Sequence, residues 1–77
     1  SWVTASYLQD WNDIKDGENY IVVTKDEGIV FKRLYNKIKK EQSITLVSTN
    51  SAYAPYTLHI DQVVEIWKFE TWNGFEF

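Results

Sequence analysis

Short runs of apolar and β-branched residues, separated by polar turns, extend along most of the chain. Tyr20–Lys25 and Ile29–Asn36 are two such runs, joined by Asp-Glu-Gly. Gly28 can adopt the left-handed backbone conformation that a tight hairpin with a bulge requires. The pattern therefore predicts an antiparallel hairpin here. Further runs predict strands at Ser43–Thr49, Tyr56–Ile60 and Val64–Trp72, with a weaker signal over Ser1–Leu8.

The segments between these runs are polar and rich in turn-forming residues. Lys37–Gln42 is a mostly basic connection, and Asn50–Pro55 combines turn formers with a proline that cannot donate to a sheet. Asp61 is a candidate cap for one helical turn, and Asp10 or Asn12 for another. We predict a mainly β fold with little helix, forming a small coiled antiparallel sheet or a partial barrel. Residues 1–77 are expected to form a single domain.

Lys32 interrupts the apolar pattern of the second hairpin strand. Residues two apart in a strand share a face, so Lys32 points the same way as Val30 and Leu34. Its amine either reaches water along an apolar surface or stays partly desolvated, which favours a neutral amine that can act as a general base. A base needs a nucleophile, and none of the serines has the sequence context of one, which leaves both interpretations open.

Composition narrows the classes of function. The formal net charge of −3 argues against a broad nucleic-acid surface, and no apolar run is long enough to span a bilayer. Cysteine is absent, so we expect no disulfide framework, which is consistent with a reducing compartment. The chain begins at Ser1 and contains no methionine. We interpret it as a piece of a longer protein.

The remaining charged residues suggest structural roles. His59 and Asp61 are too few for a metal site, and Asp10, Asp13 and Asp16 lack the ligand order of a calcium loop. Neither a metal nor a cofactor is therefore expected. Arg33 is expected to form a solvated ion pair with Glu27 or Glu65. Three lysines, Lys37, Lys39 and Lys40, are expected to lie in a solvated loop rather than to form a nucleic-acid-binding patch.

Three segments in order, DWNDIKDGENYIVVTKDEGIVFKRLY, ITLVSTNSAYAPYTLHI and VVEIWKF, resemble the C-terminal domain of LexA-like and phage-type repressors. That family comprises self-cleaving Ser/Lys peptidases with a signal-peptidase-like fold, and the closest likeness is to helix-turn-helix regulators of Bacteroides-type bacteria. The resemblance covers about Ser1 to Phe69. Its most specific elements are the hairpin ending in VFKRL and the Asn-Ser-x-Tyr-x-Pro loop.

The resemblance implies that Lys32 is the base of a Ser/Lys dyad. The family's serine lies in a Ser-Met motif before the region that matches Ser1, and that motif is absent here. We therefore expect this fragment to be inactive, whether or not the parent is an autopeptidase. The resemblance also implies a substrate-cleft loop, formed by Asn50, Ser51, Tyr53 and Pro55.

The last predicted strand carries three aromatic residues that either complete the core or form an interface, namely Trp67, Phe69 and Trp72. In the resembled family the last strands help to form the dimer. Our first hypothesis is thus a cytoplasmic, homodimeric domain of a prophage-like regulator, which contacts DNA only through an absent N-terminal domain. The alternative is a small β-barrel that binds a protein or peptide without catalysis. A secreted Ser/Lys peptidase is disfavoured because no membrane segment is present.

Overall fold

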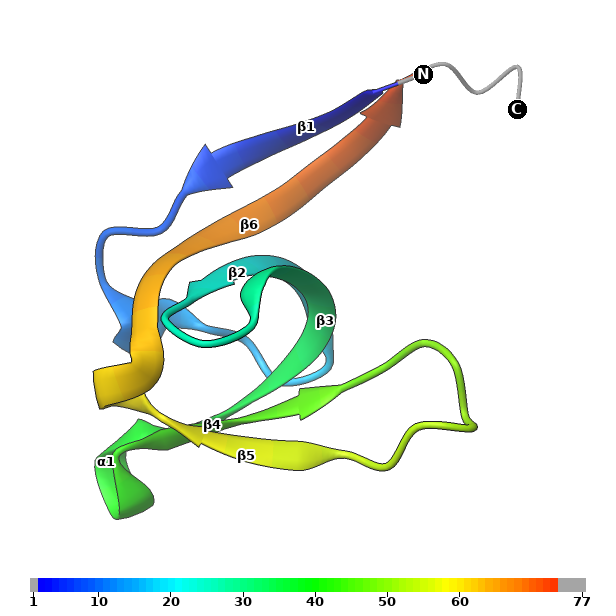
Figure 1. Cartoon of the computed structure of the whole chain (residues 1–77). Helices are drawn as coiled ribbons and strands as arrows, with labels where there is room; N and C mark the ends of the chain where they lie inside the picture. Colours follow the sequence, from blue (N-terminus) through cyan, green and yellow to red (C-terminus); the bar gives the residue numbers. More distant parts are fainter. Residues whose placement is uncertain (1, 74–77) are drawn as a thin grey trace.

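The computed structural model describes the backbone of residues 2–73 and the side chains of residues 4–70. Six antiparallel strands form one open sheet in the order β1-β6-β2-β3-β4-β5 (Figure 1). The strands are β1 (Trp2–Tyr7), β2 (Glu18–Thr24), β3 (Gly28–Lys37), β4 (Ser43–Val47), β5 (Tyr56–His59) and β6 (Val63–Asn73). Three single turns of helix connect them, η1 (Trp11–Asp13), α1 (Ile38–Glu41) and η2 (Ile60–Gln62). The predicted mainly β fold, a coiled antiparallel sheet, is confirmed.

The β2–β3 hairpin forms as predicted, with Thr24 opposite Gly28 at its closed end. Gly28 has a φ of 76°, in the left-handed region that a residue with a Cβ atom adopts at a cost. The Thr24 hydroxyl donates to the Gly28 carbonyl at 3.0 Å and accepts the Glu27 N–H at 2.9 Å. β3 lies between β2 and β4 in the sheet.

Two of the predicted connections differ in detail. The basic stretch after β3 contains the single turn α1, because the Asn36 side chain accepts the Ile38 N–H at 2.9 Å and Gln42 ends the turn with a φ of 55°. The cap of η2 is His59 rather than Asp61. The turn begins at Ile60, and the His59 imidazole accepts the Asp61 N–H at 3.1 Å. Asp10 caps η1 as predicted, through the Asn12 N–H.

One face of the sheet builds the core. The side chains with no exposed surface are Val22, Leu34, Ile44, Leu46 and Ile66, and Tyr20, Val63 and Ile14 are nearly as buried. The Tyr20 hydroxyl accepts the backbone N–H of Lys15 at 2.9 Å, which ties the connection before β2 to the core. Burying these apolar side chains supplies most of the favourable free energy of folding in so small a domain.

A contact between distant strands shows how strongly the sheet coils. The Tyr56 hydroxyl, on β5, donates to the Glu27 carboxylate in the β2–β3 turn at 2.8 Å. Burial, the hydrogen bond and the nearby negative charge together raise the pKa of Tyr56 to about 12. The edge strand β5 is therefore drawn over the same face as the β2–β3 turn.

Candidate functional site

Lys32 lies in the middle of β3, on the face of the sheet that builds the core. Its cross-strand partner is Tyr20 on β2, and the partner of Tyr20 on β6 is Lys68. Directly opposed residues share a face, so the two lysines flank the buried Tyr20 ring. Lys32 is half-buried, as is Lys68. The Lys32 side chain therefore lies on the core face, as the base interpretation requires.

The serines of the described chain do not form a dyad with Lys32. Ser6 lies on β1 opposite Lys68, in the same row as Lys32 but three strands away, and its hydroxyl donates to the Glu70 carboxylate. Ser48 follows Val47, the partner of Arg33, and its hydroxyl accepts the Asn50 N–H at 3.1 Å. Among residues 4–70, no hydrogen bond joins Lys32 to a serine hydroxyl.

The loop expected to line a substrate cleft connects β4 to β5 and extends away from the sheet (Figure 1). Asn50, Ser51, Tyr53 and Pro55 are all exposed, Tyr53 by 65%. The Asn50 side chain accepts the Ala52 N–H at 2.9 Å, and the backbone carbonyl of Asn50 accepts the Tyr53 N–H at 3.1 Å. The loop is therefore held by hydrogen bonds between its own residues. Its role in substrate binding stays a prediction.

The face of the sheet opposite the core carries a row of aromatic residues. Tyr7 pairs with Trp67, Trp67 with Ile21, and Ile21 with Phe31, from β1 to β3. The Tyr7 and Trp67 rings meet edge to face at 5.2 Å between centroids, and Phe31 lies 5.5 Å from Phe69. Trp67 and Phe69 are half-buried and do not belong to the core, whereas Tyr7 and Phe31 are 50% and 37% exposed.

We call this set the outer aromatic face, formed by Tyr7, Ile21, Phe31, Trp67 and Phe69. Its edge-to-face and tilted ring geometries are those that aromatic pairs favour. The third predicted interface residue, Trp72, belongs to β6, but its side chain lies outside the described residues.

The predicted ion pair of Arg33 is wrong. The Glu27 carboxylate accepts from the Tyr56 hydroxyl instead, and that of Glu65 accepts the Trp67 indole N–H at 3.0 Å. Both acids find uncharged donors on neighbouring elements, which sequence spacing could not indicate. Arg33 itself is half-buried on the outer face, opposite Asn19.

His59 and Asp61 do not form a metal centre. The His59 Nδ1 atom accepts the Asp61 N–H, so the Asp61 carboxylate at 3.4 Å faces a lone pair rather than a charged N–H. No cluster of three or more potential ligands occurs among the described residues. Within the same residues, no helix has the length and apolar character to cross a membrane.

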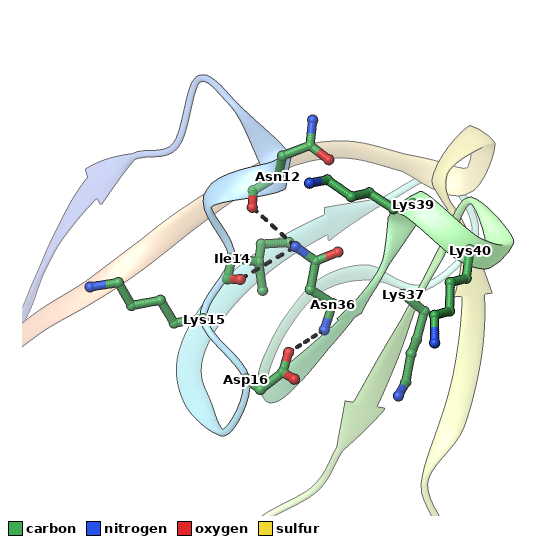
Figure 2. Close-up of a pocket in the computed structure, with 8 residues that line it drawn as sticks. All are labelled: Asn12, Ile14, Lys15, Asp16, Asn36, Lys37, Lys39 and Lys40. Carbon is green, nitrogen blue, oxygen red and sulfur yellow. Dashed lines mark hydrogen bonds between the residues drawn. The ribbon is translucent and has the colours of Figure 1, made fainter.

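A hollow of about 590 Å³ opens between the connection before β2 and the end of β3 (Figure 2). Four lysines border it, and the other lining residues include Asn12, Ile14, Asp16 and Asn36. The lysines are Lys15, Lys37, Lys39 and Lys40. We call it the basic hollow. Neither Lys32 nor any residue of the 50–55 loop lines it.

Asn36 holds the walls of the basic hollow together. Its side-chain amide donates to the carbonyls of Asn12 at 3.1 Å and Ile14 at 3.3 Å, and its oxygen accepts from Ile38. Its backbone N–H donates to the Asp16 carboxylate at 2.7 Å. One side chain at the end of β3 thus connects the η1 region to α1 (Figure 2).

A family model described as Peptidase S24-like matches residues 8–69. The matched range contains the β2–β3 hairpin, Lys32 and the 50–55 loop. The chain belongs to the Peptidase S24-like family. This confirms the resemblance drawn from the hairpin and loop motifs. No curated protein and no solved structure gives a significant match.

The sequence did not indicate the hydrogen bonds by which Asn36 connects the η1 region to α1, nor the contribution of Lys15 to the basic hollow. Asn36 lies at the end of a strand pattern and Lys15 in a turn-rich segment, so neither carries a local signal of a shared site. The cluster of Lys37, Lys39 and Lys40 is visible in the sequence, but only the fold brings Lys15 to the same hollow.

Proposed function

We propose that this S24-like chain is the self-associating, autoproteolysis-type domain of a prophage-like transcriptional regulator that acts in the cytoplasm. In this proposal Lys32 is the general base of a Ser/Lys dyad, and the serine lies in a part of the parent protein that precedes Ser1. The fragment itself is inactive. DNA is bound by a separate N-terminal domain of the parent.

The position of Lys32 is the observation that carries the proposal. It lies within the residues matched by the family, half-buried on the core face of β3 beside Tyr20. An exposed lysine on the outer face would keep its proton in water and could not serve as a base near neutral pH. Lys32 therefore lies on the face and beside the neighbours that the proposed base role requires.

The proposed reaction follows from these groups. The serine oxygen attacks the carbonyl carbon of the scissile peptide bond while the Lys32 amine takes the hydroxyl proton. The tetrahedral intermediate then collapses, the C–N bond breaks, and Lys32 returns the proton to the leaving amine. Water hydrolyses the remaining ester by the same proton route, which frees the serine.

The outer aromatic face is the proposed self-association surface. It combines exposed aromatic rings with the edge strand β1, whose Tyr7 is half exposed. Aromatic residues are enriched in protein interfaces and supply much of their binding energy. Paired domains would hold two N-terminal domains at the spacing of paired half-sites.

Self-cleavage of the full-length parent tests the mechanism. We expect Lys32→Ala to abolish cleavage because the serine loses its base. Gel electrophoresis of samples taken over time at pH 7 to 10 measures the cleavage. Lys68→Ala is the matched control, since it removes the other half-buried lysine of the same row. Unchanged cleavage in the Lys32→Ala protein would rule out Lys32 as the base.

The outer aromatic face also supports the alternative, a protein- or peptide-binding module without catalysis. The two proposals differ in what the parent does. A parent that never cleaves itself, yet stays monomeric and binds an unrelated protein through Tyr7 and Phe31, would favour the binding module.

A further inference from the structure

The basic hollow presents hydrogen-bond donors with no acceptor to pair them. In the described part of the chain, none of the ammonium groups of Lys15, Lys37, Lys39 and Lys40 forms a hydrogen bond or an ion pair. All four side chains are exposed. Figure 2 shows the Lys39 side chain extending towards Asn12, whereas the side chains of Lys15, Lys37 and Lys40 point away from Asn12.

Several of the acceptors that line the basic hollow form hydrogen bonds within the fold. The Asp16 carboxylate accepts the Asn36 N–H, and the Asn36 amide takes the carbonyls of Asn12 and Ile14. The Asn36 side-chain oxygen accepts from Ile38. A ligand entering this hollow meets four ammonium groups and one carboxylate, and this excess of positive charge favours an anion over a cation.

The distribution of charge is also uneven. Half of the eight basic residues border the basic hollow, whereas only one of the eleven acidic residues does, in a chain of net charge −3. Like charges gathered on one side of an acidic protein repel one another unless an anion neutralises them. A ligand with several negative charges gains most from this arrangement.

We propose that the basic hollow is a binding site for an oligophosphate, that is, a ligand with two or more linked phosphate groups. The volume of about 590 Å³ lies within the range of about 300–1,000 Å³ that small-molecule sites occupy. No aromatic residue lines the hollow. Recognition thus rests on the phosphates, which come either from a nucleoside triphosphate or from an inorganic polyphosphate.

This site does not depend on the proposed peptidase chemistry. Lys32 and Lys68 do not line the basic hollow, so loss of oligophosphate binding and loss of self-cleavage are separately measurable. Duplex DNA also carries phosphates, but its contacts need an extended basic surface, whereas these lysines line one hollow.

Calorimetric titration of this chain with inorganic tripolyphosphate, ATP and orthophosphate tests the proposal. At low salt we expect saturable one-to-one binding of tripolyphosphate and ATP, both tighter than orthophosphate and both weakened at 200 mM NaCl. Equal affinities for tripolyphosphate and ATP would show that the site recognises the linked phosphates alone. Tighter binding of ATP than of tripolyphosphate would show that the ligand is a nucleotide. Amide shifts in NMR spectra should centre on Asn12 and Asn36.

Lys39→Gln and Lys25→Gln form a matched pair, because each removes one charge from an exposed lysine but only Lys39 lines the hollow. We expect Lys39→Gln to weaken tripolyphosphate binding about fivefold, the factor for one charge lost about 4 Å from an anion in water. Lys25→Gln should bind as the unaltered chain does. Circular dichroism confirms that both variants are folded.

Three results would overturn the proposal. One is the absence of saturable tripolyphosphate binding at low salt. Another is an equal effect of the Lys39→Gln and Lys25→Gln substitutions, which would show only a nonspecific response to net charge. The third is tighter binding of a 20-base-pair duplex than of tripolyphosphate, lost in Lys39→Gln, which would make this face a nucleic-acid surface.

Discussion

Replacing Asn36 by aspartate tests whether one side chain holds the walls of the basic hollow together. The substitution keeps the size of the side chain and the oxygen that accepts the Ile38 N–H. It removes the amide hydrogens that now bind the carbonyls of Asn12 and Ile14. A carboxylate oxygen would face these two carbonyl oxygens instead, so two attractive contacts become repulsive.

The expected loss of stability follows from these bonds. Each neutral hydrogen bond contributes about 0.5–1.5 kcal/mol net. The bonds to Asn12 and Ile14 are 3.1 and 3.3 Å long, and two such bonds together contribute about 1–3 kcal/mol, so we expect Asn36→Asp to cost about 2 kcal/mol. In a domain of this size, that loss lowers the melting temperature by about 8–16 °C.

Asn50→Asp is the matched control. The Asn50 side chain only accepts a hydrogen bond, from the Ala52 N–H, and its amide donates none in the described structure. Both substitutions add the same charge, but the control keeps its only bond and should change stability by less than about 0.5 kcal/mol. Urea unfolding in 0.5 M NaCl screens attraction between the new carboxylate and the surrounding lysines.

The comparison has a clear failing result. If Asn36→Asp and Asn50→Asp unfold at the same urea concentration with the same slope, the Asn36 amide does not support the fold. The basic hollow would then be a feature of the loops alone.

Three further predictions concern other parts of the fold. The pKa of Tyr56 is raised from 10.0 to about 12, so the folded state favours the neutral phenol. The resulting stabilisation is complete below pH 10 and is lost as the pH rises from 10 to 12. Tyr56→Phe should abolish this pH dependence of the unfolding free energy. A pH titration of the unfolding free energy with the same slope in both proteins would contradict this. Gly28→Ala should cost about 1 kcal/mol by urea unfolding, because the φ of 76° is strained with a Cβ atom although no atom lies within 4 Å of it; an unchanged midpoint would exclude that strain. Phe31→Ser on the outer aromatic face should shift the sedimentation of a self-associated parent towards that of the monomer. Tyr53→Ser, in the exposed loop, should not. Equal sedimentation of the two variants would show that Phe31 does not lie in the interface.

Much of the fold could be predicted because its signals are local. The alternation of apolar residues around Gly28 specifies both strands of the hairpin and places Lys32 on the same face as Leu34. β3 also carries apolar residues on both faces, which is typical of a strand that lies within a sheet. These features depend on neighbours within a few positions along the chain.

The contacts that could not be predicted join residues far apart in the sequence. Asn36 binds residues more than 20 positions earlier, and Tyr56 binds Glu27 across the coiled sheet. The predicted Arg33 ion pair failed for the same reason, since each candidate acid is engaged by a donor that only the fold brings near. Polar pairing is fixed by strand order, which the sequence pattern leaves open.

The strand register also restricts where a nucleophile for Lys32 can lie. A base must come within about 3 Å of the hydroxyl that it deprotonates. Neighbouring strands are about 4.8 Å apart, so Ser6, three strands from Lys32, is roughly 14 Å away, with Tyr20 and Lys68 between them. Ser6 therefore cannot act directly with Lys32.

The other side of Lys32 is more open. The β3–β4 pairing extends only to Arg33 and Val47, so residues 28–32 pair with β2 alone among the described strands. An incoming segment could bring a hydroxyl to the core face along this unpaired edge without displacing a strand. A dyad completed from outside this chain is therefore compatible with the sheet, and one completed from β1 is not.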